Sequence, residues 1–265
     1  MENRVIVKEF SIDSLDDRKK NVRVILPIGY NDSTKKYPVL YMHDGQNLVD
    51  KAFYSGSSWE VMRTMDEFHQ QKKDMIIVGM DCDEKKRILE YSPFVTKEVI
   101  KYMRRIPVPE NEIRAEADLY ADFIINQVKP YVDGEFRTKK DRDNTFIAGS
   151  SCGGMISIYL GIKHQDLFSI IGAFSPAYWC LRKKMNEFLE SVEMKFPLKV
   201  YHDMGTKENR LFSFKYMVLQ KEFHNIICRR IGSENVMMRV GKGDLHNEFA
   251  WAKRFPEFYA YCFSK

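Results

Sequence analysis

A serine between two glycines is the feature of this sequence best suited to carry chemistry. Gly149-Ser150-Ser151-Cys152-Gly153 matches the pattern Gly-x-Ser-x-Gly, and it joins an apolar, β-rich run to an apolar helical segment. In that setting the pattern predicts a nucleophile elbow, a turn so tight that the serine adopts strained backbone angles. Only small residues fit two positions before and two positions after it, and Gly149 and Gly153 satisfy this requirement. Ser151 is therefore the candidate nucleophile.

Cys152 has two interpretations. If the elbow is read one residue later, the Cys152 thiol is the nucleophile. In the register that we favour, Cys152 follows the nucleophile, and its backbone N–H, at the start of a helix, stabilises the oxyanion. The second oxyanion donor is expected in the segment YMHDGQN, where Gly45 allows the chain to turn. We assign this donor to the backbone N–H of Gln46.

The nucleophile needs a histidine as general base and an acid, which follow it in the order acid, then histidine. His164 and His224 fall in predicted helices, and His202 falls inside a predicted strand. His246 lies on a flexible loop after the last predicted strand, which is the position that a general base requires. His246 is the predicted base of Ser151.

Two carboxylates lie at the end of the preceding strand, in the segment HDMGTKEN. Asp203 falls within the strand or at its very end, whereas Glu208 lies on the following loop, free to reach the Nδ1–H of His246. We favour Glu208 as the acid and keep Asp203 as the alternative. The carboxylate that is not used is expected to bind backbone or loop donors.

Short β-branched runs that alternate with helix-length segments predict a single α/β domain over residues 1–265, with about eight strands in a mostly parallel sheet and helices on both faces. The predicted strands are 5–11, 22–28, 38–43, 75–81, 145–150, 168–174, 198–204 and 235–240, of which the first two are expected to be antiparallel. The predicted helices are 116–132, 152–164, 181–193, 212–230 and 248–262. Pro130 is expected to mark the frayed end of the first helix.

The stretch 82–115 is poorly periodic and contains Pro93, Pro107 and Pro109. Its length suggests a lid-like or edge excursion over the site. Tyr91, Phe94 and Tyr102 lie in or beside it, and they would favour an aromatic or sugar-bearing ester as substrate.

Composition excludes several classes of protein. The net charge is +5 and the hydrophobic fraction is 44%, with charges of both signs mixed along the chain, so neither global disorder nor nucleic-acid binding is expected. Five widely spaced cysteines fit no disulfide framework and favour a reducing compartment. No segment has the pattern of a signal peptide or membrane span, so a cytoplasmic protein without membrane partners is expected. No cluster of residues has metal-ligand spacing.

Taken together, these segments resemble the Putative esterase branch of the α/β-hydrolases, which includes esterase D, feruloyl and acetyl-xylan esterases, enterochelin esterases and mycolyltransferases. The resembling segments are 37–50, 76–81, 87–94, 136–179, 200–209 and 243–258. Motif by motif, the resemblance implies a triad of Ser151, His246 and Glu208, because the family's Gly-Thr-x-acid pattern matches residues 205–208. It implies oxyanion donors at Gln46 and Cys152, the latter a position where many relatives have Met or Leu.

The expected function is that of a serine carboxylic-ester hydrolase that acts on small-molecule esters through an acyl-enzyme and needs no metal or organic cofactor. The alternatives are an acyltransferase with the same triad and a non-catalytic binding protein that retains the fold. Candidate pocket residues are Asp44, Asn47, Trp179 and Trp251, each with a core-packing or turn-capping interpretation at least as good. A homo-oligomer is left open, as are the identities of the acyl group and the alcohol.

Overall fold

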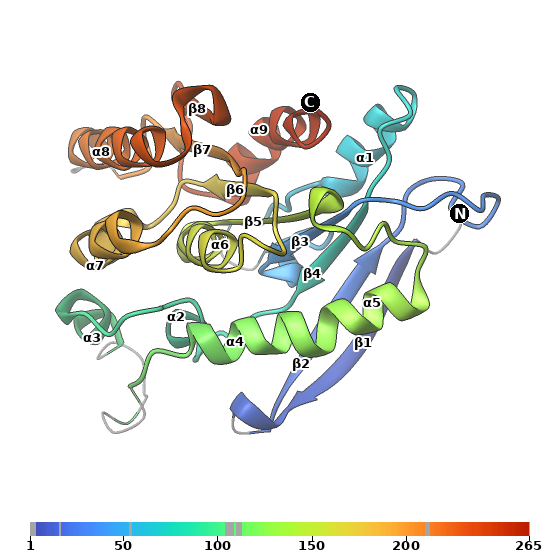
Figure 1. The fold of residues 1–265 in the computed structure, drawn as a ribbon, viewed down its shortest axis with the longest axis horizontal. Helices are drawn as coiled ribbons and strands as arrows, with labels where there is room; N and C mark the ends of the chain where they lie inside the picture. Colours follow the sequence, from blue (N-terminus) through green and yellow to red (C-terminus); the bar gives the residue numbers. More distant parts are fainter. Residues whose placement is uncertain are drawn as a thin grey trace.

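Strands run side by side through the middle of the computed structural model, which describes residues 4–15, 17–52, 55–103, 109, 113–209 and 213–264 (Figure 1). The eight strands of this sheet lie in the order β1-β2-β4-β3-β5-β6-β7-β8. Their bounds are β1 (Val5–Ile12), β2 (Arg18–Ile25), β3 (Val39–His43), β4 (Ile76–Met80), β5 (Thr145–Ser150), β6 (Ile170–Phe174), β7 (Lys199–Gly205) and β8 (Val236–Gly241). All eight predicted strands are present.

The pairing of the strands follows their hydrophobic pattern. Strands β3 to β6 are buried along their whole length, as parallel strands covered on both faces must be, and they pair in parallel. The mostly exposed β1 pairs antiparallel with β2, which pairs antiparallel with β4. Strand β2 begins at Arg18, earlier than predicted, because its charged residues continue the ladder with β1.

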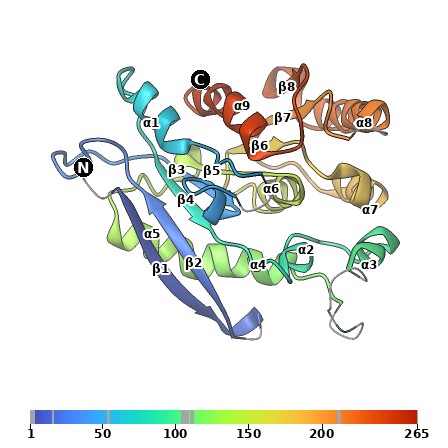
Figure 2. The same cartoon turned by 180° about the vertical axis from the view of Figure 1, so that it is seen from behind.

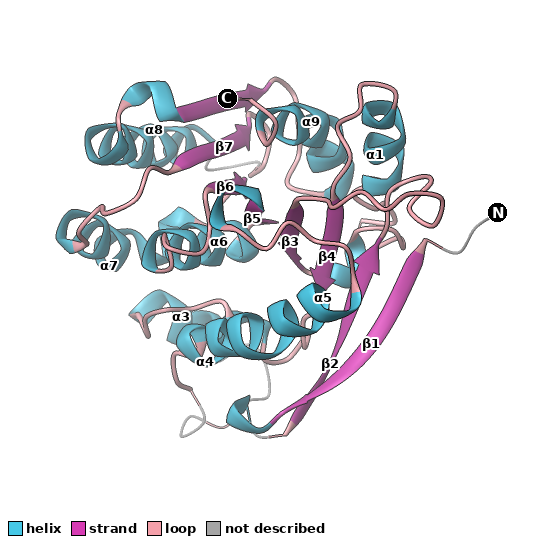
Figure 3. Ribbon diagram, turned by 45° about the vertical axis from the view of Figure 1, so that its right-hand side comes forward, coloured by secondary structure: helices cyan, strands magenta, loops and turns pink. Residues whose placement is uncertain are grey.

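Helices cover both faces of the sheet, which confirms the predicted fold class (Figure 3). Their bounds are α1 (Val61–His69), α2 (Arg87–Glu90), α3 (Lys97–Met103), α4 (Ala117–Phe123), α5 (Lys129–Glu135), α6 (Cys152–Lys163), α7 (Tyr178–Ser191), α8 (Ser213–Ile231) and α9 (Glu248–Tyr261). The apolar core around α1 and α9 is separate from the core that α4, α6, α7 and α8 bury on the opposite face. Among the described segments, no helix has the length and apolar character of a membrane span.

Pro130 does not end its helix, contrary to the prediction. A π-helical turn (Ile124–Val128) joins α4 to α5, and the helix continues to Glu135. Proline has no N–H to bond the carbonyl four residues earlier, and that carbonyl, on Asn126, lies inside the widened turn. A local change in winding thus accommodates a residue that would otherwise break the helix.

The excursion at 82–115 carries two helices that sequence periodicity did not reveal. Helix α2 packs beside α4 and α3 packs beside α7 (Figure 2). The Thr96 hydroxyl, just before α3, donates to the carbonyl of Cys180 at 3.1 Å. Residues 104–108 and 110–112 lie outside the described part of the chain.

Buried ion pairs attach Glu90, within this excursion, and Glu116, just after it, to β2. Glu90 binds Arg18 at 2.9 Å and Lys20 at 2.6 Å, and its side chain is fully buried. Glu116 binds the same Arg18 guanidinium at 2.7 Å through each carboxylate oxygen. Because each buried charge has an opposite charge in contact, the cluster is stable only as a complete set.

Replacing Glu90 with Gln should therefore lower the free energy of unfolding by about 3–5 kcal/mol, because the Lys20 ammonium would remain buried without its carboxylate. Urea-induced unfolding measures this change. The matched control is Glu9→Gln, which removes an exposed ion pair with Lys19 and should cost less than about 1 kcal/mol. Equal effects of the two substitutions would contradict the expected importance of the buried cluster.

Candidate functional site

Ser151 lies at the turn between β5 and α6, in a backbone conformation that non-glycine residues rarely adopt. Its φ is 57° and its ψ is −121°. The turn is held by hydrogen bonds from the Ser151 N–H to the Phe174 carbonyl at 2.9 Å and from the Ala177 N–H to the Ser151 carbonyl at 3.0 Å. A nucleophile elbow requires a strained turn of this kind, and the neighbouring segments fix the strain at Ser151.

The two glycines of the turn, Gly149 and Gly153, are needed because the backbone segments that carry them lie too close together for a side chain. A Cβ atom on Gly149 would lie 2.8 Å from the carbonyl carbon and oxygen of Gly153, so the backbone could not close with any side chain there. His43, at the end of β3, packs against both glycines. Burial lowers the pKa of His43 to about 3, so its imidazole is neutral at pH 7 and acts as packing beneath the elbow.

Glu208 and His246 meet beside the elbow, on the loops that follow β7 and β8. The Nδ1 atom of His246 lies 3.0 Å from Oε2 of Glu208, whose side chain is 3% exposed, whereas that of His246 is 35% exposed. Gly205 allows these loops to touch, because a Cβ there would lie 2.4 Å from the carbonyl oxygen of Asp244. The imidazole therefore has one nitrogen held by a buried carboxylate.

A group of buried donors holds the other oxygen of Glu208. Its Oε1 accepts hydrogen bonds from the Gly205 N–H at 2.6 Å and from the Ser175 hydroxyl. The Ser175 oxygen in turn accepts from the Trp251 indole at 2.9 Å and from Arg254 at 3.2 Å. These contacts leave Oε2 directed at His246.

Asp203 occupies a different environment from Glu208. Its carboxylate contacts Arg254 at 2.8 and 3.2 Å, the hydroxyl of Tyr201 at 2.9 Å and the backbone N–H of Ser175 at 2.9 Å. It is fully buried. Asp203 thus binds Arg254, the same side chain that donates to Ser175. Ser175, which also contacts Glu208, therefore lies between Asp203 and the Glu208–His246 pair.

Gln46 lies on the loop after β3, where the second oxyanion donor was expected. Its side chain is tied to Cys82, since its Nε2 donates to the thiol at 3.0 Å and its Oε1 accepts from the Cys82 N–H at 3.1 Å. Cys152 is the first residue of α6. Burial raises the pKa of its thiol, which disfavours the thiolate that a cysteine nucleophile requires.

Asp44 and Arg87 form a partly buried ion pair at the edge of the site. The guanidinium binds both carboxylate oxygens of Asp44 at 2.7 Å, and the Tyr91 hydroxyl donates to Asp44 at 3.3 Å. Burial by itself would raise the pKa of Asp44, but Arg87 outweighs that effect and lowers it. Asp44 is therefore charged, and both of its carboxylate oxygens are bound by Arg87.

Two cavities open at Ser151. The larger, about 480 Å³, is also lined by Asp44, Gln46, Asn47, His246 and Trp251. The smaller, about 120 Å³, is also lined by Cys152, Tyr91 and Trp179.

All the candidate site residues except Glu208 thus line one of the two cavities at Ser151, and Glu208 contacts His246. Asn47 donates to Glu248 at 3.3 Å within the larger cavity. Trp251 is 5% exposed and packs edge-on against His246, whereas Trp179 is 44% exposed and stacks on Tyr216. Of the excursion's aromatic residues, Phe94 packs against the ring of Tyr159, and the side chain of Tyr102 lies outside the described residues.

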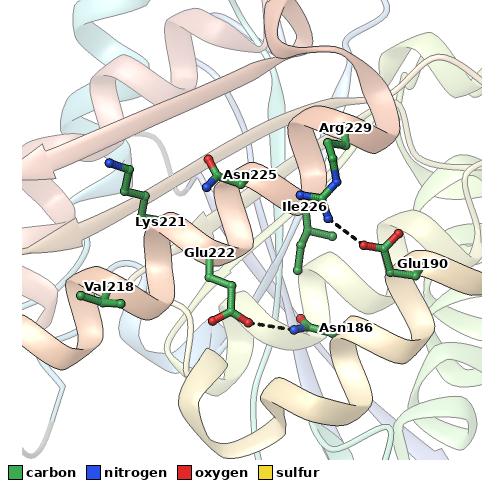
Figure 4. Close-up of a pocket in the computed structure, with 8 residues that line it drawn as sticks. All are labelled: Asn186, Glu190, Val218, Lys221, Glu222, Asn225, Ile226 and Arg229. Carbon is green, nitrogen blue, oxygen red and sulfur yellow. Dashed lines mark hydrogen bonds and ion pairs between the residues drawn. The ribbon is translucent and has the colours of Figure 1, made fainter.

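A third cavity, of about 600 Å³, is an open groove between α7 and α8 (Figure 4). Glu222 binds Asn186 across it at 2.9 Å, and Arg229 binds Glu190 at 2.8 Å, so a hydrogen bond and an ion pair link its two walls. None of the candidate site residues lines it. In the ranges that the structure covers, no group of three or more His, Cys, Asp or Glu residues could hold a metal ion.

Sequence reasoning missed Arg87, Ser175 and Arg254. Arg87 and Ser175 fall in segments that carry the family resemblance, RILEYSPF and FSPAYW, but neither belongs to a Gly-x-Ser-x-Gly or Gly-Thr-x-acid pattern. Arg254 lies mid-helix in a segment of mixed charge, where a solvated side chain is the ordinary expectation. Only the fold reveals that it is 8% exposed and paired with Asp203.

Comparisons with known protein sequences match this chain to an esterase family and to a relative of similar length. The family model described as "Putative esterase" matches residues 13–260. The uncharacterized protein YbbA of Bacillus subtilis (strain 168) is 21% identical over 260 residues, which cover 95% of this chain and 97% of YbbA.

Solved structures share the fold. An enterobactin esterase from Shigella flexneri superposes with a TM-score of 0.77 at 14% identity; the match covers 99% of this chain but only 59% of that one. A ferulic acid esterase superposes with a TM-score of 0.68 at 18% identity, over 97% of this chain and 96% of that one.

The buried Asp203–Arg254 pair gives a stability prediction. Asp203→Asn should lower the free energy of unfolding by about 3–5 kcal/mol, because Arg254 loses a buried carboxylate on which two of its nitrogens depend. Chemical denaturation measures it. Glu257→Gln, which removes an exposed partner of Arg239, is the control and should change stability by less than about 1 kcal/mol. An Asp203→Asn protein as stable as this control would refute the expectation.

Proposed function

Since this chain belongs to the Putative esterase family and is accordingly a carboxylic ester hydrolase, we propose that it works through an acyl-enzyme formed on Ser151, with His246 as the base and Glu208 as the acid. The observation that carries this proposal is the 3.0 Å contact of Glu208 with His246 in the same cleft as the strained Ser151. A carboxylate on Nδ1 fixes the tautomer whose Nε2 accepts a proton.

In the proposed reaction, the Ser151 hydroxyl attacks the ester carbonyl carbon while His246 Nε2 takes its proton. The backbone N–H groups of Gln46 and Cys152 stabilise the oxyanion, each worth about 10²–10³ in kcat in comparable sites. The tetrahedral intermediate collapses, and the alcohol leaves with the proton from His246. Water then attacks the acyl-enzyme with His246 again as the base, which releases the acid and restores Ser151.

We also propose where the enzyme is located and what kind of molecule it binds. All five cysteines are free thiols, as in a reducing compartment, which supports a cytoplasmic location. The partner is a small-molecule ester, and the chain acts as one domain.

A fluorophosphonate tests whether Ser151 is the activated nucleophile. Intact-mass analysis should detect one phosphonyl adduct on the wild type and none on Ser151→Ala. Cys152→Ala should still form the adduct, because the proposal uses only the backbone N–H of Cys152. An adduct that persists on Ser151→Ala would place the nucleophile elsewhere.

Glu208→Gln should reduce kcat for p-nitrophenyl acetate by about a thousandfold or more with little change in KM, because an amide no longer selects the required imidazole tautomer. Asp203→Asn, compared at a temperature where circular dichroism shows both proteins folded, should retain far more activity. If Asp203→Asn were the inactive variant and Glu208→Gln the active one, the acid would be Asp203.

A further inference from the structure

Ser175 lies at the centre of the buried polar groups behind Glu208, although it has no part in the proposed reaction steps. It follows β6 directly and is 1% exposed, and its φ of 44° is rare in a residue that has a Cβ. Its backbone N–H donates to Oδ1 of Asp203 at 2.9 Å and to the Asp203 carbonyl at 3.1 Å. These two bonds fix the backbone of Ser175, and with it the place of the hydroxyl.

The groups around this hydroxyl decide where its proton goes. The indole N–H of Trp251 lies 2.9 Å from the Ser175 oxygen, and the guanidinium of Arg254 lies 3.2 Å from it. An indole N–H and a guanidinium can only donate hydrogen bonds, so they occupy both lone pairs of the oxygen. Among the contacts of the described residues, one acceptor is then left for the single proton of Ser175, and it is Oε1 of Glu208.

This bond determines how the carboxylate of Glu208 is oriented. Oε1 accepts from the Ser175 hydroxyl and also from the Gly205 N–H at 2.6 Å. Oε2 is left to contact Nδ1 of His246 at 3.0 Å. A side chain held by two donors on one oxygen cannot turn away from the imidazole without losing both bonds, so the second oxygen stays in place.

Arg254 connects the same arrangement to the loop that carries His246. Its Nη2 donates to Ser175 at 3.2 Å, and its Nη1 binds Oδ2 of Asp244 at 2.5 Å, two residues before His246. The side chain of Arg254 is buried. One buried guanidinium therefore contacts both the residue that holds Glu208 and the loop that carries the histidine.

We propose that Ser175 is a positioning residue for the esterase reaction: by donating its only proton to Glu208, it holds the carboxylate at Nδ1 of His246 and so maintains one imidazole tautomer. This inference rests on the proposed function, because it concerns the acid and the base assigned to Ser151. Ser175 lines neither of the two cavities at Ser151. Loss of its hydroxyl should therefore slow the chemical step and leave substrate binding unchanged.

Two substitutions remove the hydroxyl. Ser175→Ala keeps the Cβ, whereas Ser175→Gly suits the positive φ and serves if the alanine variant folds poorly. Because a hydrogen bond to a charged group is lost, each should lower kcat for p-nitrophenyl acetate about 10- to 100-fold. KM should stay within about twofold of the wild-type value.

Ser169→Ala is the matched control for these variants. Ser169 lies just before β6, at the opposite end of the strand from Ser175, and it is also buried. Its hydroxyl donates to the Thr145 carbonyl at 3.5 Å. The substitution thus removes a buried hydroxyl from the same segment, and it should leave kcat and KM unchanged.

A second measurement reports the imidazole directly. Nitrogen NMR chemical shifts distinguish a protonated ring nitrogen from an unprotonated one, and the signals of His246 are those missing from His246→Asn. At alkaline pH, where the neutral ring is observed, the wild type should have a protonated Nδ1 and an unprotonated Nε2. In both Ser175 variants the two shifts should converge, because the tautomers mix. Ser169→Ala should keep the wild-type shifts.

The outcomes separate this inference from the proposed function. The inference is wrong if the Ser175 variants, shown by circular dichroism to be folded, keep the wild-type kcat. It is also wrong if kcat falls while the ring shifts of His246 stay unchanged, or if the wild type already has mixed tautomers. A wild type that forms no fluorophosphonate adduct, or a Glu208→Gln protein as active as the wild type, instead overturns the proposed triad, even where the ring shifts respond to Ser175.

Discussion

The close approach of Gly149 and Gly153 is the constraint on which the rest of the site depends. With no Cβ between them, the end of β5 and the start of α6 lie within van der Waals distance, and Ser151 is forced to the outside of the turn. The strain at Ser151 is offset by hydrogen bonds to Phe174 and Ala177, which fix the end of β6 as well. The elbow therefore determines where β6 ends and where the chain turns into Ser175.

Below this turn, one buried polar network links elements that are distant in the sequence. Ser175, also at positive φ, connects Glu208 on the loop after β7 with Trp251 and Arg254 on α9. Arg254 extends the network to Asp203 and Asp244. Buried polar groups are stable only when their partners are complete, so the network makes the positions of the two loops that carry Glu208 and His246 mutually dependent.

The sequence predicted most of the scaffold, because strands buried on both faces and helices with one apolar face have patterns that local residues reveal. It also singled out Ser151, Glu208 and His246, since a tight turn and the order of loops along the chain constrain residue types. It did not reveal α2 and α3, which are short and are held by contacts with α4 and α7 instead of by their own periodicity. Arg87 and Arg254 were missed for a related reason: their partners, Asp44 and Asp203, are 43 and 51 residues away.

The walls of the smaller cavity have a consequence for divergence within this fold. Val99, Met155 and Leu181 lie on helices, whereas Ser151, Glu208 and His246 lie on the turns and loops that follow the strands. Substitutions in the helices can therefore change which ligand fits this cavity without disturbing the sheet that holds the elbow. Gene duplication followed by change in α3 and α7 would be a short evolutionary route to a new specificity, provided that Glu90 and Glu116 continue to anchor the segment between them.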